Sequence, residues 1–306
     1  MLLYKQQVNK KVTTIQRKRQ GNNMTTYAVT GSTGHFGQEA IKQLLKLVPN
    51  DQIIALARNT KKAQDLLPKE VKILPGDYTN QKQLEESLTG VDKLLFISSQ
   101  PGGPVTRQVQ HQNVVTAAKN AGVKYIAYTS FYHADQATAP LADDHKATEK
   151  MIKDSNLKYS FLRNNWYLEN DADKIEAAVN HQDFVYAAGN GRAGWALESE
   201  YSEAAAKVLV TENPQTIYEF AGKTRTYQEL AESIDAQFKV VSLSIEDFRH
   251  ALKASGMDEA VVEILTSFQE LIRDGNLAGD SDDLPNVLGR PLTALPKAIK
   301  SIISEK

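Results

Sequence analysis

The sequence predicts an α/β protein in which a doubly wound parallel sheet is followed by a smaller C-terminal α/β region. Two observations support this prediction. From Thr25 to Arg163, short runs rich in β-branched and aromatic residues alternate with segments of helical spacing. After Arg163 the alternation loosens, and glycines punctuate a loop at residues 189–194. We therefore expect residues 24–165 to form the first domain and residues 166–306 a C-terminal substrate-binding region.

The first domain is expected to contain six strands joined by crossover helices. Several of the strands are nearly continuous apolar runs, as expected when helices cover both faces of a sheet. The strands are expected at residues 27–30, 53–57, 71–74, 94–97, 125–129 and 159–162. Helical spacing appears at residues 37–47, 80–88, 105–121 and 143–155, and Asn80 with Gln83 resembles a capping box.

The C-terminal region offers shorter elements. Strands are expected near residues 184–186, 217–220 and 240–242. Helices are expected to begin near Thr226, Ser244 and Asp258. Thr226 with Glu229, and Ser244 with Asp247, match the side-chain chemistry of helix starts.

Composition narrows the function classes. The chain has no cysteine, which excludes a thiolate nucleophile, a cysteine redox pair and a disulfide framework. Apolar runs are far shorter than the ~20 residues of a membrane-spanning helix, so no membrane span is expected. No secretory signal is evident, and a cytoplasmic location is expected.

Charge is distributed unevenly along the chain. Six of the 36 basic residues precede Met24, and all 37 acidic residues follow it, so the chain from Met24 onward carries a net charge of −7. Such an acidic body argues against a nucleic-acid partner. Basic arms can bind nucleic acid or anionic membranes. For residues 1–23 we favour a disordered basic extension, or a true start at Met24.

The glycine-rich turn after the first expected strand carries the strongest chemical signal. The spacing Gly-x-x-Gly-x-x-Gly suits a dinucleotide: the first glycine permits a tight turn, the second lets the backbone approach a pyrophosphate, and the third allows close helix packing. Free N–H groups at the helix start favour the anion. An ordinary glycine-rich turn is the alternative. The predicted cofactor-binding residues here are Gly31, Ser32, Thr33, Gly34, His35, Phe36 and Gly37.

The residue after the second expected strand predicts the cofactor. Folds that bind NAD usually place an acid there to hold the adenosine ribose, but this chain has Arg58. An arginine can pair with a 2′-phosphate through charge-assisted hydrogen bonds, helped by Lys61 or Lys62. We therefore predict NADP(H). The alternative is that Arg58 is a solvated surface residue and that the site accepts either cofactor.

Two further strand ends are expected at the same edge of the sheet, where ligands of open parallel sheets bind. Asp77 and Tyr78 follow the third strand and are predicted to bracket the adenine, although Asp77 also suits a simple turn. Ser98, Ser99 and Gln100 follow the fourth strand and are predicted to line the path to the nicotinamide.

Several segments resemble the NADPH:quinone oxidoreductases of the NmrA-like branch of atypical short-chain dehydrogenases. The resemblance covers Thr25 to the C-terminal helix. It implies an NADP(H)-binding Rossmann domain, a small C-terminal domain with a quinone pocket between them, and direct hydride transfer from the nicotinamide to the quinone. The segments are the glycine-rich turn, Arg58-Asn59 and residues 127–130, 141–151, 162–167 and 289–291.

One departure concerns catalysis, because the Tyr-x-x-x-Lys pair of ordinary short-chain dehydrogenases is missing. If Glu149 follows the lysine position by four residues, His145 stands in the lysine slot and Leu141 in the tyrosine slot. A quinone needs less help, since it accepts hydride readily and takes its proton from water or a weak acid. His133 and His145 are the candidate catalytic proton donors, with Tyr132 behind them.

A bland interpretation is available for each of these histidines, since a lone histidine more often serves as a surface or hydrogen-bonding residue. The six histidines of the chain show no metal-ligand spacing, and no metal is expected.

The pocket between the domains is expected after the sixth strand. Asn165, Trp166 and Tyr167 are the predicted substrate-binding residues there, together with Tyr132, because an aromatic ring could stack on a flat quinone. Packing in the core is the alternative for Trp166. Trp195 is a weaker candidate for the pocket.

The predicted function is NADPH-dependent reduction of quinones, with a small-molecule quinone as partner and a homo-oligomer allowed. The main alternative is a non-catalytic NADP(H)-binding redox sensor of the NmrA-like type, since the missing Tyr-x-x-x-Lys pair suits both. Reduction or epimerisation of another carbonyl or sugar substrate is a third interpretation, and the missing pair counts against it.

Overall fold

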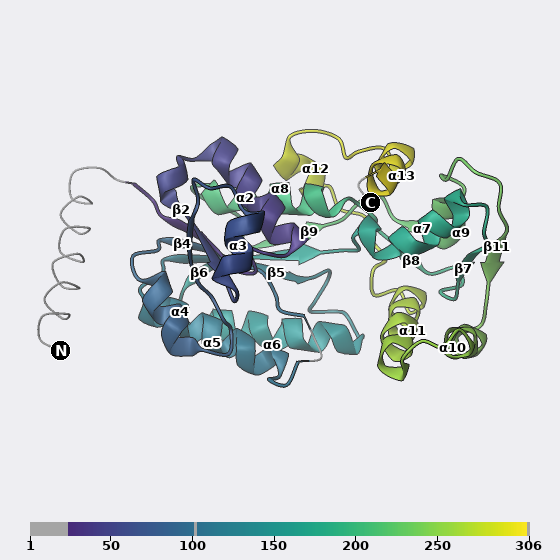
Figure 1. The fold of residues 1–306 in the computed structure, drawn as a ribbon, viewed down its shortest axis with the longest axis horizontal. Coiled ribbons are helices and arrows are strands. Elements are labelled where there is room, and N and C mark those ends of the chain that lie inside the picture. The colour runs from purple at the N-terminus through teal and green to yellow at the C-terminus, as the bar shows by residue number, and fades with distance from the viewer. Residues whose placement is uncertain (1–23, 101–102, 305–306) are drawn as a thin grey trace, which may run out of the picture.

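The structure is a computed structural model that describes residues 24–100 and 103–304 (Figure 1). The predicted basic extension at residues 1–23 lies outside the described residues. Within them, none of the helices combines the length and the apolar character that crossing a bilayer requires.

A parallel sheet of seven strands forms the centre of the larger part of the molecule, in the order β3-β2-β1-β4-β5-β6-β9. The order reverses between β1 and β4, which creates the crevice where open α/β sheets bind ligands. All residues of β2 and β5 are buried, as expected for a sheet covered on both faces. The strands are β1 (Tyr27–Val29), β2 (Ile53–Ala57), β3 (Lys72–Pro75), β4 (Lys93–Phe96), β5 (Tyr125–Phe131), β6 (Lys158–Asn164) and β9 (Ile217–Phe220).

Helices pack against both faces of this sheet (Figure 1). One face is covered by α2 (His35–Leu47), α3 (Thr60–Leu66), α8 (Glu198–Val210) and α12 (Asp283–Leu288), and the short η1 (Asn50–Gln52) precedes β2. The other face is covered by α4 (Gln81–Leu88), α5 (Arg107–Asn120) and α6 (Pro140–Asp154). The predicted doubly wound α/β fold is thus confirmed.

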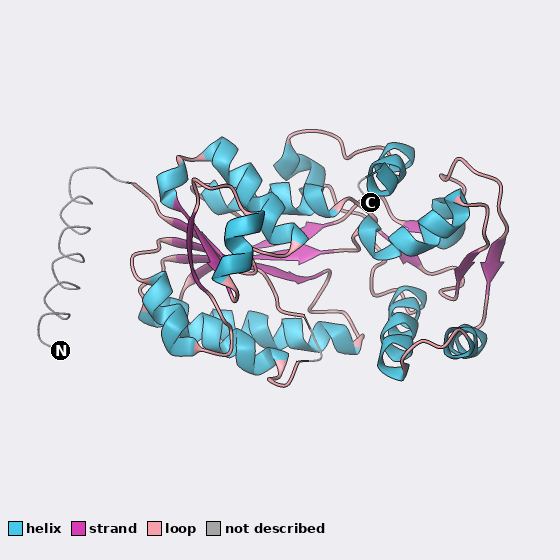
Figure 2. Ribbon diagram, in the orientation of Figure 1, coloured by secondary structure: helices cyan, strands magenta, loops and turns pink. Residues whose placement is uncertain are grey.

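The smaller part lies beyond the carboxyl ends of the large sheet and contains two short sheets (Figure 2). In one, β8 (Arg192–Ala193) pairs antiparallel with β10 (Arg225–Thr226); in the other, β7 (Phe184–Tyr186) pairs parallel with β11 (Val240–Ser242). Its helices are η2 (Leu168–Asp171), α7 (Ala172–Val179), α9 (Tyr227–Ala231), α10 (Ile245–Ala254), α11 (Glu259–Arg273) and α13 (Leu295–Ser304).

The chain passes between the two parts more than once, which differs from the single division expected between residues 165 and 166. After Asn165 it enters the smaller part, then returns through α8 and β9, and α12 also packs on the large sheet. The physical reason is the open edge of β6, which pairs in parallel with β9 from Phe161 and Ile217 onward. A strand pattern in the sequence does not say which sheet the strand joins.

The predicted helix starts are present. Thr226 and Glu229 form a complete capping box, and the Ser244 side chain accepts a hydrogen bond from the Asp247 backbone N–H. Asp258 precedes α11 and accepts from the Ala260 N–H. These caps supply acceptors for backbone N–H groups that have no partner inside the helix.

Candidate functional site

The glycine-rich turn joins β1 to α2 at the carboxyl edge of the sheet, where the strand order reverses between β1 and β4. Gly31 has φ +59°, a left-handed conformation that glycine adopts without strain. At Gly37 a Cβ would lie 2.8 Å from the Cα of Ser32 and closer still to the Gly31 carbonyl oxygen, so only glycine lets α2 approach the turn. Gly34 and His35 are exposed at the start of α2. The backbone at this helix start is therefore open to a ligand from the crevice.

The Tyr78 side chain connects the strand ends next to this turn. Its hydroxyl lies 2.6 Å from both the Thr30 Oγ1 and the Ile97 carbonyl oxygen, which ties the end of β1 to the end of β4. Asp77 accepts hydrogen bonds from the Thr79 N–H and hydroxyl, as expected for a turn acid. The hydroxyl of Tyr78 is thus used inside the protein, and the adenine contacts of both residues stay a prediction.

Basic side chains gather after β2. Arg58 is exposed, and the Asn59 side chain that follows it caps α3 by accepting from the Lys62 N–H at 3.0 Å. Lys61 and Lys62 are also exposed at the start of α3. The end of β2 therefore presents the positive charge that the predicted 2′-phosphate contact needs.

A buried histidine holds the segment after β4. The Ser99 backbone N–H donates to the His111 Nε2 at 3.0 Å, so the proton of this ring lies on Nδ1, 2.7 Å from the Thr148 hydroxyl. Burial, and then the charge of Arg107, lower the pKa of His111 to about 3. Ser98 is fixed by a hydrogen bond from its N–H to Thr129. The role of His111 was missed in the sequence, where a single polar residue in a helix carries no signal.

His145 lies inside the protein, not on a surface. Its Nε2 is 3.1 Å from the Arg107 Nη2 and its Nδ1 is 3.0 Å from the Tyr128 hydroxyl. Because a guanidinium only donates, Nε2 accepts and the ring proton faces Tyr128. Burial, and then Arg107, lower the pKa of His145 well below its usual value. Both nitrogens are thus occupied, which does not favour the predicted role as proton donor.

His133 occupies a different environment, at the end of β5. It has φ +46°, and its side chain is 34% exposed. Its backbone N–H donates to the Glu219 carboxylate at 2.9 Å, and its Nδ1 lies 3.5 Å from the same group. Of the two predicted donors, only His133 combines exposure with a position directly beyond a carboxyl strand end.

Arg163, on β6, forms hydrogen bonds with α6, β9 and the turn after β5 that carries His133. It pairs through two hydrogen bonds of 2.9 Å with Glu149 on α6, and its Nη1 donates to Glu219 on β9 and to Asp135 in the turn after β5. No local pattern in the sequence indicates this cluster, because its members are separated by up to 84 positions along the chain. The cluster fixes the backbone that carries His133.

The residues that follow β6 mainly hold neighbouring segments of the chain together. The Asn165 side chain donates to the Leu277 carbonyl and accepts from the N–H groups of Trp166 and Gly194. Trp166 is 6% exposed and packs edge-to-face on Phe268. Trp166 therefore has the position of a core residue, the alternative to a role in the substrate pocket. Asn165 likewise has both polar atoms engaged by the backbone.

Tyr167 connects these residues to the glycine-rich turn. Its ring stacks on Phe36 with centroids 6.1 Å apart, and its hydroxyl accepts from the Asn164 side chain at 2.8 Å. Of the three predicted residues after β6, Tyr167 is therefore the one placed beside the predicted cofactor turn.

Comparisons with known proteins agree with this architecture. A family model described as NAD(P)H-binding matches residues 31–172. Over 283 residues, 90% of this chain and 98% of the relative, the sequence is 39% identical to quinone oxidoreductase 2 of Escherichia coli. The chain belongs to this quinone oxidoreductase family.

Two solved structures of similar proteins carry cofactor. The NADPH complex of an NADPH-dependent quinone oxidoreductase from Escherichia coli matches with a TM-score of 0.85 at 39% identity, covering 91% of this chain and 100% of the other. The NADP(H) complex of a Citrobacter triphenylmethane reductase matches with a TM-score of 0.85 at 35% identity, covering 90% and 99%. The quinone oxidoreductase fold of this chain is thereby confirmed.

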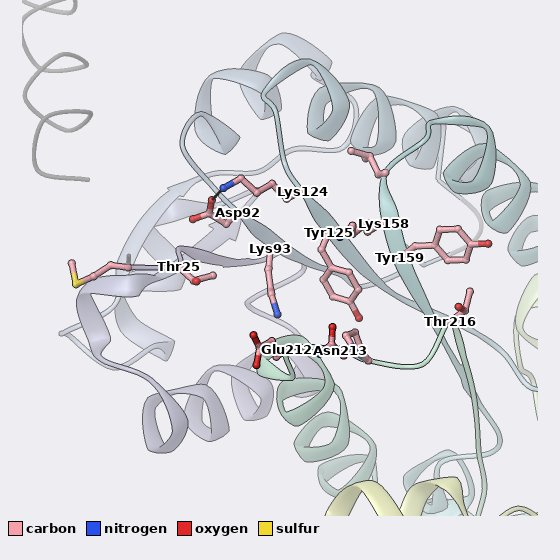
Figure 3. Close-up of a pocket in the computed structure, with 13 residues that line it drawn as sticks. Thr25, Asp92, Lys93, Lys124, Tyr125, Lys158, Tyr159, Glu212, Asn213 and Thr216 are labelled. Carbon is pink, nitrogen blue, oxygen red and sulfur yellow. Dashed lines mark ion pairs between the residues drawn. The ribbon is translucent and has the colours of Figure 1, made fainter. Parts of the chain in front are cut away.

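Cavity size alone does not locate the site in this quinone oxidoreductase family member. A cavity of about 790 Å³ lies at the amino ends of the strands, lined by Lys93, Tyr125 and Glu212 among others (Figure 3). Two smaller cavities, of about 370 and 500 Å³, flank the carboxyl side, one beside His35 and one beside Gly222. Because open parallel sheets bind ligands at the carboxyl ends, the crevice side is the candidate site.

Proposed function

We propose that the protein reduces quinones with NADPH. The observation that carries the proposal is the glycine-rich turn, which places an open helix start at the switch point beside the exposed Arg58, in a chain 39% identical to a quinone oxidoreductase. NADP(H) is the proposed cofactor. The proposed cofactor contacts are residues 31–37, Arg58, Asp77, Tyr78 and residues 98–100.

The chemistry requires little from the protein beyond placement. Bound NADPH supplies a hydride, and the quinone gains that hydride and one proton to become the hydroquinone. The protein positions the two rings against each other and excludes other orientations. His133 is the proposed proton source, since its side chain is partly exposed and its Nδ1 lies 3.5 Å from the Glu219 carboxylate.

A cationic acceptor is the second candidate substrate class. The chain is also 35% identical to a triphenylmethane reductase over 90% of its length. Glu219, Asp280 and Asp283 lie near Tyr132, with Arg163 paired to Glu219, and the chain from Met24 onward carries a net charge of −7, which favours a positively charged acceptor over a negatively charged one. A triphenylmethane dye therefore belongs in the same assay as a benzoquinone.

The test is oxidation of NADPH, followed by its absorbance, with a short-chain benzoquinone and without one. We expect a rate far above the quinone-free rate. Tight binding of NADPH without faster oxidation by any of several quinones or dyes would replace this proposal with the redox-sensor alternative.

Three further statements stay predictions. We expect no nucleic-acid partner and a cytoplasmic location that fractionation would test; a homo-oligomer is allowed, and size-exclusion chromatography would reveal it.

A further inference from the structure

We propose that the hydroxyl of Tyr132 donates a hydrogen bond to the carbonyl oxygen of the acceptor while hydride is transferred, and that Gly279 covers this hydroxyl until the acceptor enters. The inference rests on the proposed reductase function and assigns a catalytic role to a residue that touches the substrate.

The first observation is an unpaired polar group. Tyr132 is fully buried, and its hydroxyl has no hydrogen-bond partner among the described residues. Leaving a buried hydroxyl unpaired is costly, so such a group calls for an explanation. Other buried tyrosines near the crevice are paired: Tyr128 with His145, and Tyr201 with the Gly194 carbonyl.

The second observation is position. Tyr132 directly follows β5 at the carboxyl edge of the sheet, and its backbone N–H donates to the Asn164 carbonyl at the end of β6. Its ring lies 4.1 Å, centroid to centroid, from that of His133, the proposed proton source. The phenol is thus next to the group that would complete the reduction.

The third observation is that Gly279, a residue without a side chain, lies against the Tyr132 hydroxyl. A Cβ on Gly279 would lie 2.9 Å from the Tyr132 hydroxyl and 3.3 Å from the His133 Nε2. Gly279 itself is only partly buried, between the exposed Ala278 and Asp280. Gly279 therefore lies against both polar groups, and because it has no side chain, a small displacement of it would open the buried Tyr132 hydroxyl to an acceptor beside the partly exposed His133.

The electrostatic environment sets the role. Burial, followed by the charges of Glu219, Asp280 and Asp283, raises the pKa of Tyr132 to about 12. The phenol therefore keeps its proton and acts as a hydrogen-bond donor. A donor aimed at an oxygen that gains negative charge during reaction stabilises the transition state more than the ground state.

The step balances without a further oxidant or reductant. The hydride that NADPH supplies forms the new O–H bond at the carbonyl oxygen of the quinone that lies away from Tyr132, which leaves NADP⁺. The electron pair displaced through the quinone ring leaves negative charge on the oxygen held by Tyr132. That oxygen then takes one proton from His133, which is reprotonated by water. The net result consumes one quinone, one NADPH and one proton and yields one hydroquinone and one NADP⁺.

Tyr132→Phe tests the proposal because it removes only the unpaired hydroxyl. We expect kcat to fall roughly 10- to 100-fold, in line with the loss of one transition-state donor. The NADPH dissociation constant should not change, and the melting temperature should stay equal or rise. A kcat within twofold of the unmodified protein, or a lower melting temperature with kcat retained, would overturn the proposal.

Tyr125→Phe is the matched control. Tyr125 lies at the opposite end of β5, in the cavity at the amino edge (Figure 3), and its side chain is likewise buried. We expect this variant to keep full kcat. Equal losses in both variants would show a general packing effect and overturn the proposal. Failure of the proposed function is distinguishable, because the unmodified protein would then be inactive as well.

Discussion

Arg58 shows how one exposed side chain can select a cofactor. Arg58 directly follows β2, and the exposed Lys61 and Lys62 come three and four residues later. The sequence has no acid at the position that usually binds the adenosine ribose. A guanidinium there gains charge-assisted hydrogen bonds from the 2′-phosphate of NADPH that NADH cannot offer.

We therefore expect Arg58→Ala to weaken NADPH binding roughly 10- to 100-fold and to leave NADH binding unchanged, as the loss of one charged hydrogen bond predicts. Titration by nicotinamide fluorescence measures both constants. Lys150→Ala, which removes an exposed lysine paired with Asp154 on α6, is the control. Equal dissociation constants for NADPH and NADH in the unmodified protein would contradict the assignment.

The buried histidines couple stability to pH. His111 is neutral in the folded protein, with its pKa lowered to about 3, whereas in the unfolded chain it titrates near 6.5. As pH falls below about 6.5, the unfolded chain takes up a proton that the folded protein does not. Stability is therefore lost in that direction, by about 1.4 kcal/mol per pH unit for this group.

His111→Gln should remove this part of the acid sensitivity. We expect its free energy of unfolding to fall less steeply between pH 6 and pH 4 than that of the unmodified protein, by about 1 kcal/mol per pH unit. Denaturant unfolding at each pH measures the slope. His250→Gln, at an exposed position on α10, should keep the original slope. Parallel slopes for His111→Gln and the unmodified protein would refute the coupling.

At the scale of elements, Asp171 holds the smaller part together. The side chain is 2% exposed and accepts hydrogen bonds from both tryptophan indoles, Trp166 at 3.2 Å and Trp195 at 2.8 Å. The Tyr227 hydroxyl and the Lys174 ammonium donate to its other oxygen. One carboxylate thus joins η2 and α7 to the segments that carry β8 and α9.

Asp171→Ala is expected to lower the free energy of unfolding by about 3–5 kcal/mol, because it leaves a partly buried ammonium and several donors unpaired. Tryptophan fluorescence of the folded state should shift, since both indoles of the chain lose their acceptor. Asp183→Ala, at an exposed position, is the control. A stability loss below 1 kcal/mol would show that Asp171 is not a joint.

Trp166→Ala tests whether Trp166 is a core residue or a pocket residue. We expect a stability loss of about 3–5 kcal/mol from the cavity left in the core. The KM for quinone should change little among molecules that stay folded, since Trp166 is buried against Phe268. A several-fold higher KM without loss of stability would return Trp166 to the substrate pocket.

At the scale of the whole molecule, charge should influence the choice of acceptor. Residues 24–306 carry a net charge of −7, and Glu219, Asp280 and Asp283 lie near Tyr132. A negative field of this kind disfavours the approach of an anion and is screened by salt.

At saturating NADPH and low salt, we expect a sulfonated benzoquinone to show a kcat/KM roughly 2- to 10-fold below that of a neutral benzoquinone of similar potential. Added salt should narrow the difference. A preference for the sulfonated quinone, or a ratio indifferent to salt, would contradict the electrostatic argument.

The sequence by itself determined what depends on local physics. The expected strands lie within a few residues of the observed ones, because strand patterns depend on neighbours along the chain, whereas the two-residue strands β8 and β10 were not expected. The helix starts at Thr226 and Ser244 followed from side chains that cap their own backbone. The glycine-rich turn was recognisable because Gly31 and Gly37 meet local steric demands that no other residue satisfies.

Only the tertiary structure decided which distant residues meet. In the folded protein β9 joins the large sheet, and the indoles of Trp166 and Trp195 both donate hydrogen bonds to the Asp171 carboxylate. His145 is buried, whereas the side chain of His133 is partly exposed. The physical reason is that burial and pairing arise from contacts between segments far apart along the chain. The local pattern around a tryptophan or a histidine is the same whether it faces a crevice or a core.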